Sequence, residues 1–303
     1  MFKLAHISDL HLGPIPQLTW RELASKRLTG YLNWQRNRRK SMFGAIVENL
    51  LVHVEQAQGD HLAITGDLIN LATHAEIENA RLWLEALGKP EDTTVVPGNH
   101  DAYVPGALAE VSRAWYPWMK ADGKADCKTP RTEPVFPFMR VREPVAIIGV
   151  STAIATPPPL ASGYFGPDQA RRTAQLLAQA GEANLFRVVL IHHPPVRGAI
   201  QQHKRLFGIN RFAATLAQGG GELVLHGHTH LNTVHWIDLP DRRVPVVGIA
   251  SASQAPGARR PASSYNMFSI SGGPDAWRLS RDLHVLKSMD EGFCLERSDR
   301  FLA

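Results

Sequence analysis

Short apolar stretches and helical periods alternate along the first hundred residues. Residues 2–7, 61–65 and 93–96 are short and mainly apolar, a pattern that is typical of buried strands. Residues 41–56 carry apolar side chains four positions apart, which predicts a helix that begins near Ser41, and a second helix is predicted over 75–87. Because strands alternate with helices, this part of the chain predicts an α/β fold with parallel strands.

The same pattern continues past the middle of the chain and then changes. Further buried strands are predicted at 145–150, 187–191 and 222–226, and further helices at 167–180 and 212–216. Beyond Leu231 only strands are predicted, at 233–237, 244–250 and 265–270. The polar residues 120–137 and the prolines at 157–159 predict loops, since proline suits neither a helix interior nor a central strand.

No repeat and no interdomain linker interrupts this order of elements. We therefore expect one domain over residues 1–303. The role of a C-terminal extension, residues 251–303, stays open at this stage. It completes the second sheet, covers the functional site, or joins a partner.

Composition narrows the class of protein. Of 303 residues, 44% are hydrophobic and 20% are charged, as in ordinary globular proteins. No apolar run approaches the roughly eighteen residues that span a bilayer. A chemical motif already begins at Asp9, which leaves no room for a secretory signal, so we expect a cytoplasmic protein. Cys127 and Cys294 match no metal or redox spacing and are expected to be reduced thiols.

The net charge of +5 comes from one segment, residues 18–40. This basic segment holds seven Lys and Arg residues against one Glu, so the rest of the chain is near −1. Its basic residues are interleaved with leucines and aromatic residues, including Trp20, Tyr31 and Trp34. Such a pattern is typical of an interfacial helix on anionic lipid, of a lid over a phosphorylated substrate or a nucleic acid, and of a surface helix whose apolar side faces the core.

Polar clusters follow five of the predicted strands. In a parallel α/β sheet the carboxyl ends of the strands share one edge, where ligands bind, so these five clusters can meet at one site. Carboxylate, amide oxygen and imidazole groups are ligands for divalent metals such as Zn, Mn or Fe. The clusters are Asp9-x-His11, Gly66-Asp67, Gly98-Asn99-His100-Asp101, His192-His193-Pro194-Pro195 and Gly227-His228-x-His230.

The local geometry of these clusters also favours a shared site. In an extended chain, residues two apart project to the same side, so Asp9 and His11 can both face one cavity, as can His228 and His230. Adjacent residues project to opposite sides, so His192 and His193 are not expected to bind the same ion. Glycine precedes several of the candidate ligands, where a tight turn or a close backbone approach favours it.

The ordered series of clusters resembles the calcineurin-like metallophosphoesterases, over residues 9–230 and with no motif element missing. The resemblance implies an α/β fold in four layers, a sandwich of two mixed β-sheets flanked by helices. It also implies a dinuclear metal centre with seven ligands. One ion is bound by Asp9, His11 and His230, the other by Asn99, His192 and His228, and Asp67 bridges the two.

A mechanism follows from this assignment. Two divalent ions, from among Mn, Fe, Zn and Co, activate a water molecule that attacks the phosphorus of a small phosphate ester. His100 is not a ligand in this hypothesis. It neutralises charge on the phosphoryl group or protonates the leaving oxygen. Asp101 accepts a hydrogen bond from His100 and fixes its tautomer. His192 is preferred over His193 as the ligand.

Three functions remain open from the sequence. The Gly-Asn-His-Asp and His-His-Pro-Pro motifs resemble phosphodiesterases that act on cyclic nucleotides or glycerophosphodiesters. The basic segment 18–40 instead favours a pyrophosphatase for a nucleotide-linked lipid such as UDP-2,3-diacylglucosamine, with peripheral contact to an anionic membrane. A scaffold without activity is the third alternative, although every ligand position is filled. We expect no nucleic-acid partner.

Overall fold

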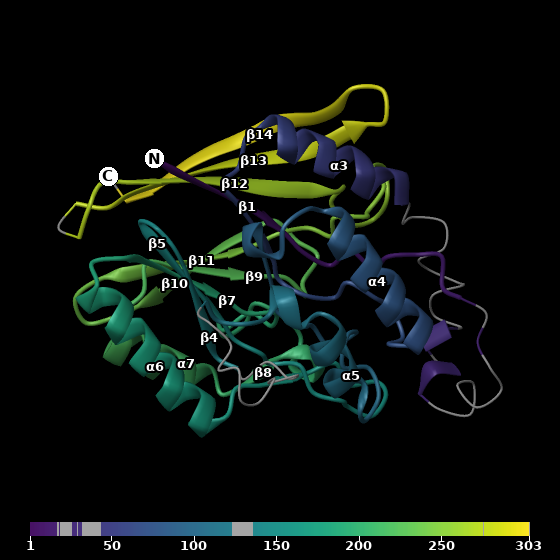
Figure 1. The fold of residues 1–303 in the computed structure, drawn as a ribbon, viewed down its shortest axis with the longest axis horizontal. Helices are drawn as coiled ribbons and strands as arrows, with labels where there is room; N and C mark the ends of the chain where they lie inside the picture. Colours follow the sequence, from purple (N-terminus) through teal and green to yellow (C-terminus); the bar gives the residue numbers. More distant parts are fainter. Residues whose placement is uncertain are drawn as a thin grey trace.

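Two six-stranded β-sheets pack face to face, and helices cover their outer surfaces in the computed structural model of the protein (Figure 1). The structure describes residues 1–16, 18, 26–28, 30–31, 44–122, 136–274 and 276–302. This arrangement is the α/β sandwich of two mixed sheets that the resemblance implied. Cys127 and most of the basic segment 18–40 lie outside the described residues.

The first sheet contains both ends of the chain. Its strand order is β14-β13-β12-β1-β2-β3, and β1, β2 and β3 run parallel, as the strand–helix alternation predicted. The remaining strands pair antiparallel with β1 and with one another. Its strands are β1 (Phe2–Ile7), β2 (His61–Ile64), β3 (Thr93–Val95), β12 (Ser264–Ser271), β13 (Arg278–Ser288) and β14 (Gly292–Leu302).

The second sheet is built from the middle of the chain. Its strand order is β10-β11-β9-β7-β5-β4, with parallel pairing from β11 to β5 and antiparallel strands at both edges. Its strands are β4 (Phe138–Arg142), β5 (Val145–Gly149), β7 (Phe186–Leu190), β9 (Leu223–His226), β10 (Thr233–Asp238) and β11 (Arg243–Gly248). A separate two-stranded ribbon pairs β6 (Gly163–Tyr164) with β8 (Leu206–Phe207).

The central strands are apolar on both faces because each face packs against another layer. In β1, Leu4 contacts the core between the sheets, whereas Ile7 contacts the core under the helices of the first sheet. In β7, Val188 faces the other sheet, and Val189 belongs to the core under the helices of the second sheet. Alternate residues therefore enter different cores, which explains why these strands have continuous apolar runs.

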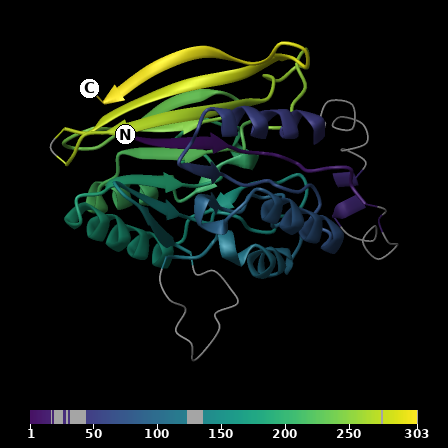
Figure 2. The ribbon, with the colours of Figure 1, turned by 45° about the horizontal axis from the view of Figure 1, so that its top comes forward.

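The helices form the two outer layers. Helices α3 (Gly44–Gln56), α4 (His74–Ala86) and α5 (Ala107–Ala114) accompany the first sheet, and α3 contacts β12 and β14. Helices α6 (Pro167–Glu182) and α7 (Ile209–Gly219) pack on each other beneath the second sheet (Figures 1 and 2). The start of α6 at Pro167 was predicted, since proline suits the first turn of a helix.

The C-terminal part differs from the expectation for residues 251–303. It does not complete the second sheet, because β12, β13 and β14 extend the sheet of β1 (Figure 2). The edge strand β14 pairs with β13 through register shifts, one of them between Leu283 and His284. Cys294 on β14 is a free thiol. Among the described helices, none combines the length and hydrophobicity needed to cross a membrane.

Arg140, on β4 of the second sheet, forms hydrogen bonds with the segments around β3 of the first sheet. Its side chain is almost fully buried, at 2% exposure, and its guanidinium donates to backbone carbonyls before, at the start of and after β3 rather than to a carboxylate. The acceptors are the carbonyl oxygens of Pro90, Thr93, Pro117 and Lys120. Arg140 therefore satisfies four polar groups near the strand that leads to Asn99 and His100.

Replacing Arg140 by methionine is expected to lower the free energy of unfolding by about 3 kcal/mol or more, since each buried acceptor left unsatisfied costs about 1–3 kcal/mol. Urea denaturation monitored by circular dichroism measures this change. Arg171→Met, at a solvent-exposed arginine of α6, is the matched control and should leave the midpoint unchanged. Equal midpoints for the two variants would show that the Arg140 hydrogen bonds add nothing to stability.

Candidate metal centre

All seven predicted metal ligands lie at the carboxyl ends of parallel strands. Asp9 and His11 follow β1, Asp67 follows β2, and Asn99 follows β3. From the second sheet, His192 follows β7, and His228 and His230 follow β9. Each of the seven is buried, with exposures between 0% and 8%. The two sheets therefore bring the predicted ligands together in one buried cluster.

One half of the cluster contains Asp9, His11 and His230. One ligand atom from each lies within 4.8 Å of the others. The Nε2 atom of His230 is 3.1 Å from Oδ1 of Asp9 and 3.3 Å from Nε2 of His11. These three residues are the set that the family resemblance assigns to one metal ion.

Asp67 lies between the two halves. Its Oδ2 atom is 3.9 Å from Nε2 of His11 and 3.4 Å from Nε2 of His192. Its Oδ1 atom accepts the backbone N–H of His100 at 2.7 Å. A carboxylate in this position has an oxygen near ligands of both subsites, which is the geometry that a bridging ligand needs.

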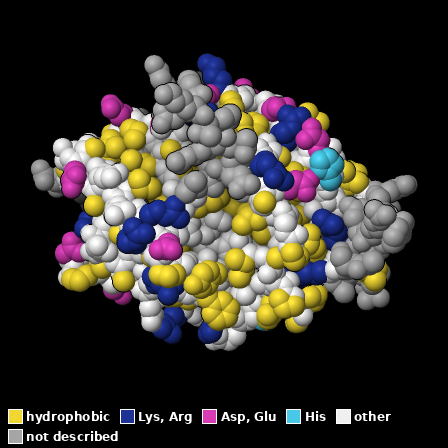
Figure 3. All heavy atoms as spheres, turned by 60° about the horizontal axis from the view of Figure 1, so that its bottom comes forward, with side chains coloured by type: hydrophobic (Ala, Val, Ile, Leu, Met, Phe, Trp, Pro, Cys, Tyr) yellow, Lys and Arg dark blue, Asp and Glu magenta, His cyan; other side chains and the backbone are white. Residues whose placement is uncertain are grey.

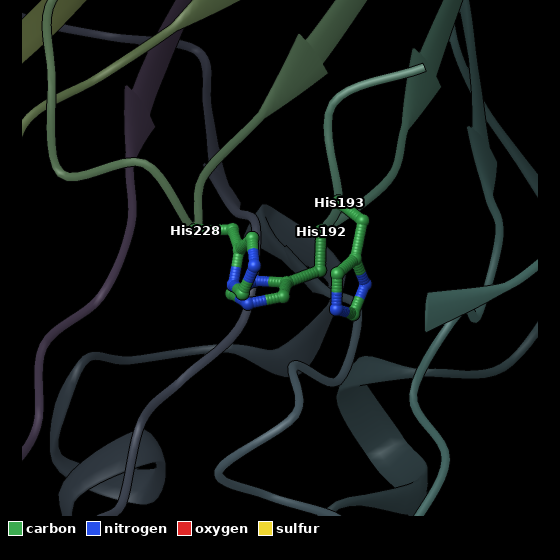
Figure 4. Close-up of side chains that lie close together, drawn as sticks. All are labelled: His192, His193 and His228. Carbon is green, nitrogen blue, oxygen red and sulfur yellow. The ribbon is translucent and has the colours of Figure 1, made fainter. Parts of the chain in front are cut away.

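The second half of the cluster contains Asn99, His192 and His228. The Nε2 atom of His192 is 3.2 Å from Oδ1 of Asn99, and the rings of His192 and His228 are 5.1 Å apart. Figure 4 shows His228 coming from the end of β9 to meet His192 from the end of β7. Both predicted halves of the metal centre are therefore present as groups of converging side chains.

His193 lies nearer to this group than the sequence predicted. One of its ring nitrogens lies within 4.8 Å of ligand atoms of His192 and His228 (Figure 4). Both of its nitrogens have other partners, however. Nδ1 is 2.8 Å from the Thr152 hydroxyl, and Nε2 is 3.3 Å from the carbonyl oxygen of Ala161. These bonds hold His193 against the ring of His228 as a supporting residue, in keeping with the preference for His192 as ligand.

Backbone carbonyls set the orientation of three histidine rings. Nδ1 of His11 contacts the Ile69 carbonyl at 3.2 Å, and Nδ1 of His192 contacts the Thr65 carbonyl at 2.6 Å. A carbonyl only accepts, so each contacting nitrogen carries the proton. In the neutral ring, which is the form that binds a metal ion, the other nitrogen presents a lone pair to the cluster. In His228 the two nitrogens exchange roles. Its Nε2 donates to the Lys204 carbonyl at 3.0 Å, so Nδ1 is the atom with the lone pair.

These lone pairs point at oxygen atoms that also accept hydrogen bonds. Only a proton or a metal ion between them makes the contact favourable. Nε2 of His192 is directed at oxygen atoms of Asn99 and Asp67. Burial alone would lower the pKa of His192, yet the Asp67 and Asp9 carboxylates raise it to about 9. The negative potential is strong enough to hold a proton there against desolvation. Divalent cations satisfy the same demand, so these residues fit a metal centre.

The sequence profile of the calcineurin-like phosphoesterases matches residues 2–232, which include every one of these ligands. The chain belongs to this family. It is therefore a metal-dependent hydrolase of phosphoric ester bonds, and membership implies two divalent metal ions. No curated protein sequence matches the chain.

Solved structures share the fold of this phosphoesterase at low sequence identity. A dimetal phosphatase from Danio rerio has a TM-score of 0.65 at 10% identity, over 99% of this chain and 98% of that one. A purple acid phosphatase from yellow lupin has a TM-score of 0.61 at 10% identity, and a 5′-nucleotidase precursor from Thermus thermophilus has 0.52 at 14%. The last two matches cover 99% of this chain but only 53% and 54% of theirs.

The backbone at the phosphoesterase site is not extended, contrary to the expectation for the two His-containing pairs. Asp9 and His11 have φ angles of 53° and 45°, and His228 and His230 have 67° and 55°. These values lie in the left-handed region, which is uncommon for residues other than glycine, although Asn, Asp and His adopt it more often than the rest. The side chains therefore converge through strained turns after the strands, not through the two-residue period of an extended chain.

Two of the glycines near the ligands are required by close approach. A Cβ atom on Gly98 would lie 2.2 Å from Oδ1 of Asp67, and one on Gly227 would lie 1.9 Å from the Ser8 hydroxyl and 2.6 Å from Oδ2 of Asp9. No side chain fits at these distances. Close backbone approach, which was the reason expected for glycine beside the candidate ligands, therefore applies at both positions.

Asp101 has a different role from the predicted one. It takes no hydrogen bond from the His100 ring, whose Nδ1 lies 2.6 Å from the carbonyl oxygen of Asn70. The Asp101 carboxylate instead accepts four backbone N–H groups, from Asp67, Leu68, Ile69 and Gly98, at 2.8 to 3.2 Å. It therefore fastens the β2–α4 loop, residues 65–73, which carries Asp67.

Glu76 is a second buried carboxylate that holds the same loop, and the sequence analysis missed it. It accepts the backbone N–H groups of Asn70, Leu71 and Thr73 at 3.0 to 3.3 Å. Thr73 is the N-cap of α4, and Thr73 and Glu76 form a capping box. The Thr-x-x-Glu spacing was readable in the sequence as a helix start. Its function at the site was not, because that depends on which loop the carboxylate contacts.

Proposed function

We propose that this phosphoesterase is a phosphodiesterase for small anionic phosphodiesters, such as cyclic nucleotides or glycerophosphodiesters. Two divalent ions, from among Mn, Fe, Zn and Co, would be held by Asp9, His11 and His230 on one side and by Asn99, His192 and His228 on the other. Asp67 would bridge them. When bound, such ions supply Lewis acidity and lower the pKa of a bound water molecule toward neutrality.

His100 supports the proposed reaction. One of its ring nitrogens lies within 4.8 Å of ligand atoms of His11 and Asp67, and the rings of His11 and His100 meet edge to face at 4.8 Å. With Nδ1 donating to the Asn70 carbonyl, Nε2 faces the substrate, where the protonated ring donates to a leaving oxygen and returns to the neutral form with a lone pair on Nε2. An alkoxide leaving group, as in a glycerophosphodiester, needs that proton most.

The positive charge of the loops around the candidate ligands supports the proposal of a small anionic substrate. The segments that leave the strand ends, residues 10–16, 68–75, 102–106, 193–206, 227–232 and 251–263, contain no Asp or Glu. They contain Arg197, Lys204, Arg205, Arg259 and Arg260. Arg260 donates from Nη1 to the carbonyl of Thr229, between two ligands, at 3.2 Å. Positive charge beside the ligands favours binding of an anion.

A specific surface feature favours the pyrophosphatase for a nucleotide-linked lipid as the second candidate. Tyr164 and Phe207 are register partners in the β6–β8 ribbon and are 47% and 44% exposed, and nearby Leu160 is 38% exposed. The same ribbon region supplies the carbonyl of Ala161 that contacts His193. Figure 3 shows hydrophobic side chains, with Lys and Arg among them, across the face at the bottom of Figure 1, where β8 lies. Such a face suits an acylated anionic substrate.

A substrate panel separates the two candidates. The enzyme is stripped with a chelator, reconstituted in turn with Mn, Fe, Zn and Co, and assayed on bis(p-nitrophenyl) phosphate, p-nitrophenyl phosphate, a cyclic nucleotide, glycerophosphocholine and a UDP-acyl sugar. We expect turnover of the diesters to exceed that of the monoester by at least tenfold in kcat/KM, which corresponds to about 1.4 kcal/mol. Asp67→Asn, purified identically, measures contaminating activity.

Each outcome of the panel has one meaning. Turnover of a cyclic nucleotide or of glycerophosphocholine supports the proposed phosphodiesterase. Hydrolysis of the UDP-acyl sugar alone would reject it in favour of the pyrophosphatase. A preference for the monoester would leave the family assignment in place but reject the diester substrate.

A further inference from the structure

Tyr103 joins His100 to the part of the basic segment that the structure describes. The rings of His100 and Tyr103 stack with centroids 5.5 Å apart and an interplanar angle of 17°. Tyr103 is buried, at 9% exposure. Lys26 places its ammonium group 4.4 Å from the centre of the Tyr103 ring. The aromatic ring therefore contacts both the candidate proton donor and a residue of the basic segment.

Two further described residues of the basic segment, Arg27 and Gly30, lie close to Tyr103 and the β2–α4 loop. A Cβ atom on Gly30 would lie 2.4 Å from the Tyr103 hydroxyl, so the backbone passes directly beside that ring. Arg27 donates to the carbonyls of Leu71 and Ala72, at 3.0 and 2.6 Å. These carbonyls follow Asn70, whose own carbonyl orients His100. Lys26, Arg27 and Gly30 thus lie against the Tyr103 ring or against the loop that carries the Asn70 carbonyl.

We propose that Tyr103 is a positioning residue for His100 and that Lys26 holds Tyr103 in place. This inference rests on the proposed role of His100 in proton transfer. The Asn70 carbonyl fixes the tautomer of His100 and one end of the ring, whereas the stacked face of Tyr103 fixes the plane of the ring. Without the stack, the imidazole can turn about its last side-chain bond, and the fraction of molecules with a correctly aimed nitrogen falls.

Leaving-group dependence distinguishes positioning from a general structural effect. Tyr103→Leu is expected to lower kcat about 10–100-fold for a diester with an alkoxide leaving group, the range typical for residues that orient a functional group. The loss should be several-fold smaller for p-nitrophenolate, which leaves without a proton. Tyr103→Phe keeps the ring and should retain most activity. Lys26→Met should show the same dependence on the leaving group, with a smaller loss of kcat. Tyr116→Leu, at a half-buried tyrosine of the short helix at Tyr116–Trp118, is the matched control.

A double-mutant cycle with His100→Ala completes the test. If Tyr103 acts through His100, the Tyr103→Leu change should cause no further loss in the His100→Ala background. Full loss in that background, or equal losses for both leaving groups, would overturn the proposal. A Lys26→Met variant with no leaving-group dependence would overturn the role of Lys26. The cycle is run on whichever ester with an alkoxide leaving group the wild type hydrolyses best, monoester or diester, so a failed diester preference leaves it interpretable.

Discussion

Replacing Asp67 by asparagine is expected to remove stable binding of both metal ions and to lower kcat roughly 10³-fold or more, since each ion contributes several kcal/mol. Among the carboxylates that the structure describes, Asp67 alone has an oxygen within 4 Å of candidate ligand nitrogens from both sheets. Three nearby histidines, His192 foremost, hold its pKa well below the ordinary range in spite of burial, so it carries a full negative charge. Asparagine preserves the shape and removes that charge.

Metal content per chain, measured by plasma mass spectrometry after gel filtration, checks the loss of binding, and kcat on bis(p-nitrophenyl) phosphate checks the rate. Asp238→Asn, at a solvent-exposed ion pair of β10, is the control and should match the wild type in both. Two ions still bound to Asp67→Asn at wild-type affinity would refute the bridging role.

Replacing His100 by alanine is expected to leave both metal ions bound and to lower kcat roughly 10²–10⁴-fold, the usual contribution of a general acid or base. The Nδ1 atom of His100 is committed to Asn70, and its backbone N–H binds Asp67 through a group that alanine keeps. The metal cluster should therefore survive the substitution, while the proton needed by an alkoxide leaving group is lost.

The matched control for this variant is His235→Ala, at a histidine of the edge strand β10. The ratio of kcat for alkoxide and p-nitrophenolate leaving groups should fall in His100→Ala and stay constant in the control. Release of one metal ion from His100→Ala would instead make His100 a ligand, which its nearness to His11 and Asp67 makes a serious alternative.

The central strands and the convergence of the candidate ligands were predictable because the patterns that indicate them are local in the sequence. Strands such as β7 and β9 are mainly apolar and end shortly before polar clusters. β13 and β14 were missed since Arg281, a buried arginine paired with Asp299, interrupts the apolar positions, and because the middle of β14 is exposed and charged. Helix α5 was missed because it is short and buries few side chains.

The supporting residues of the site could not be predicted for a different reason. Asp101 lies beside His100 in sequence, yet it binds backbone N–H groups more than thirty positions away. Glu76 and Tyr103 likewise act on loops and rings that only the tertiary structure brings to them. The residue type alone shows that a side chain can bind a metal ion. Whether a side chain stabilises the site depends on which backbone groups the tertiary structure places beside it.

The left-handed turns at the ligands imply a trade-off between stability and function. Asp9, His11, Asp67, His228 and His230 all have φ between 45° and 67°. A non-glycine residue in this conformation stores about 1–2 kcal/mol of backbone strain, although aspartate tolerates it better than histidine. Glycine would relieve that strain at every one of these positions and would delete a ligand each time. The fold thus tolerates backbone strain at its candidate ligands, and mutations chosen for thermal stability alone would tend to remove those side chains first.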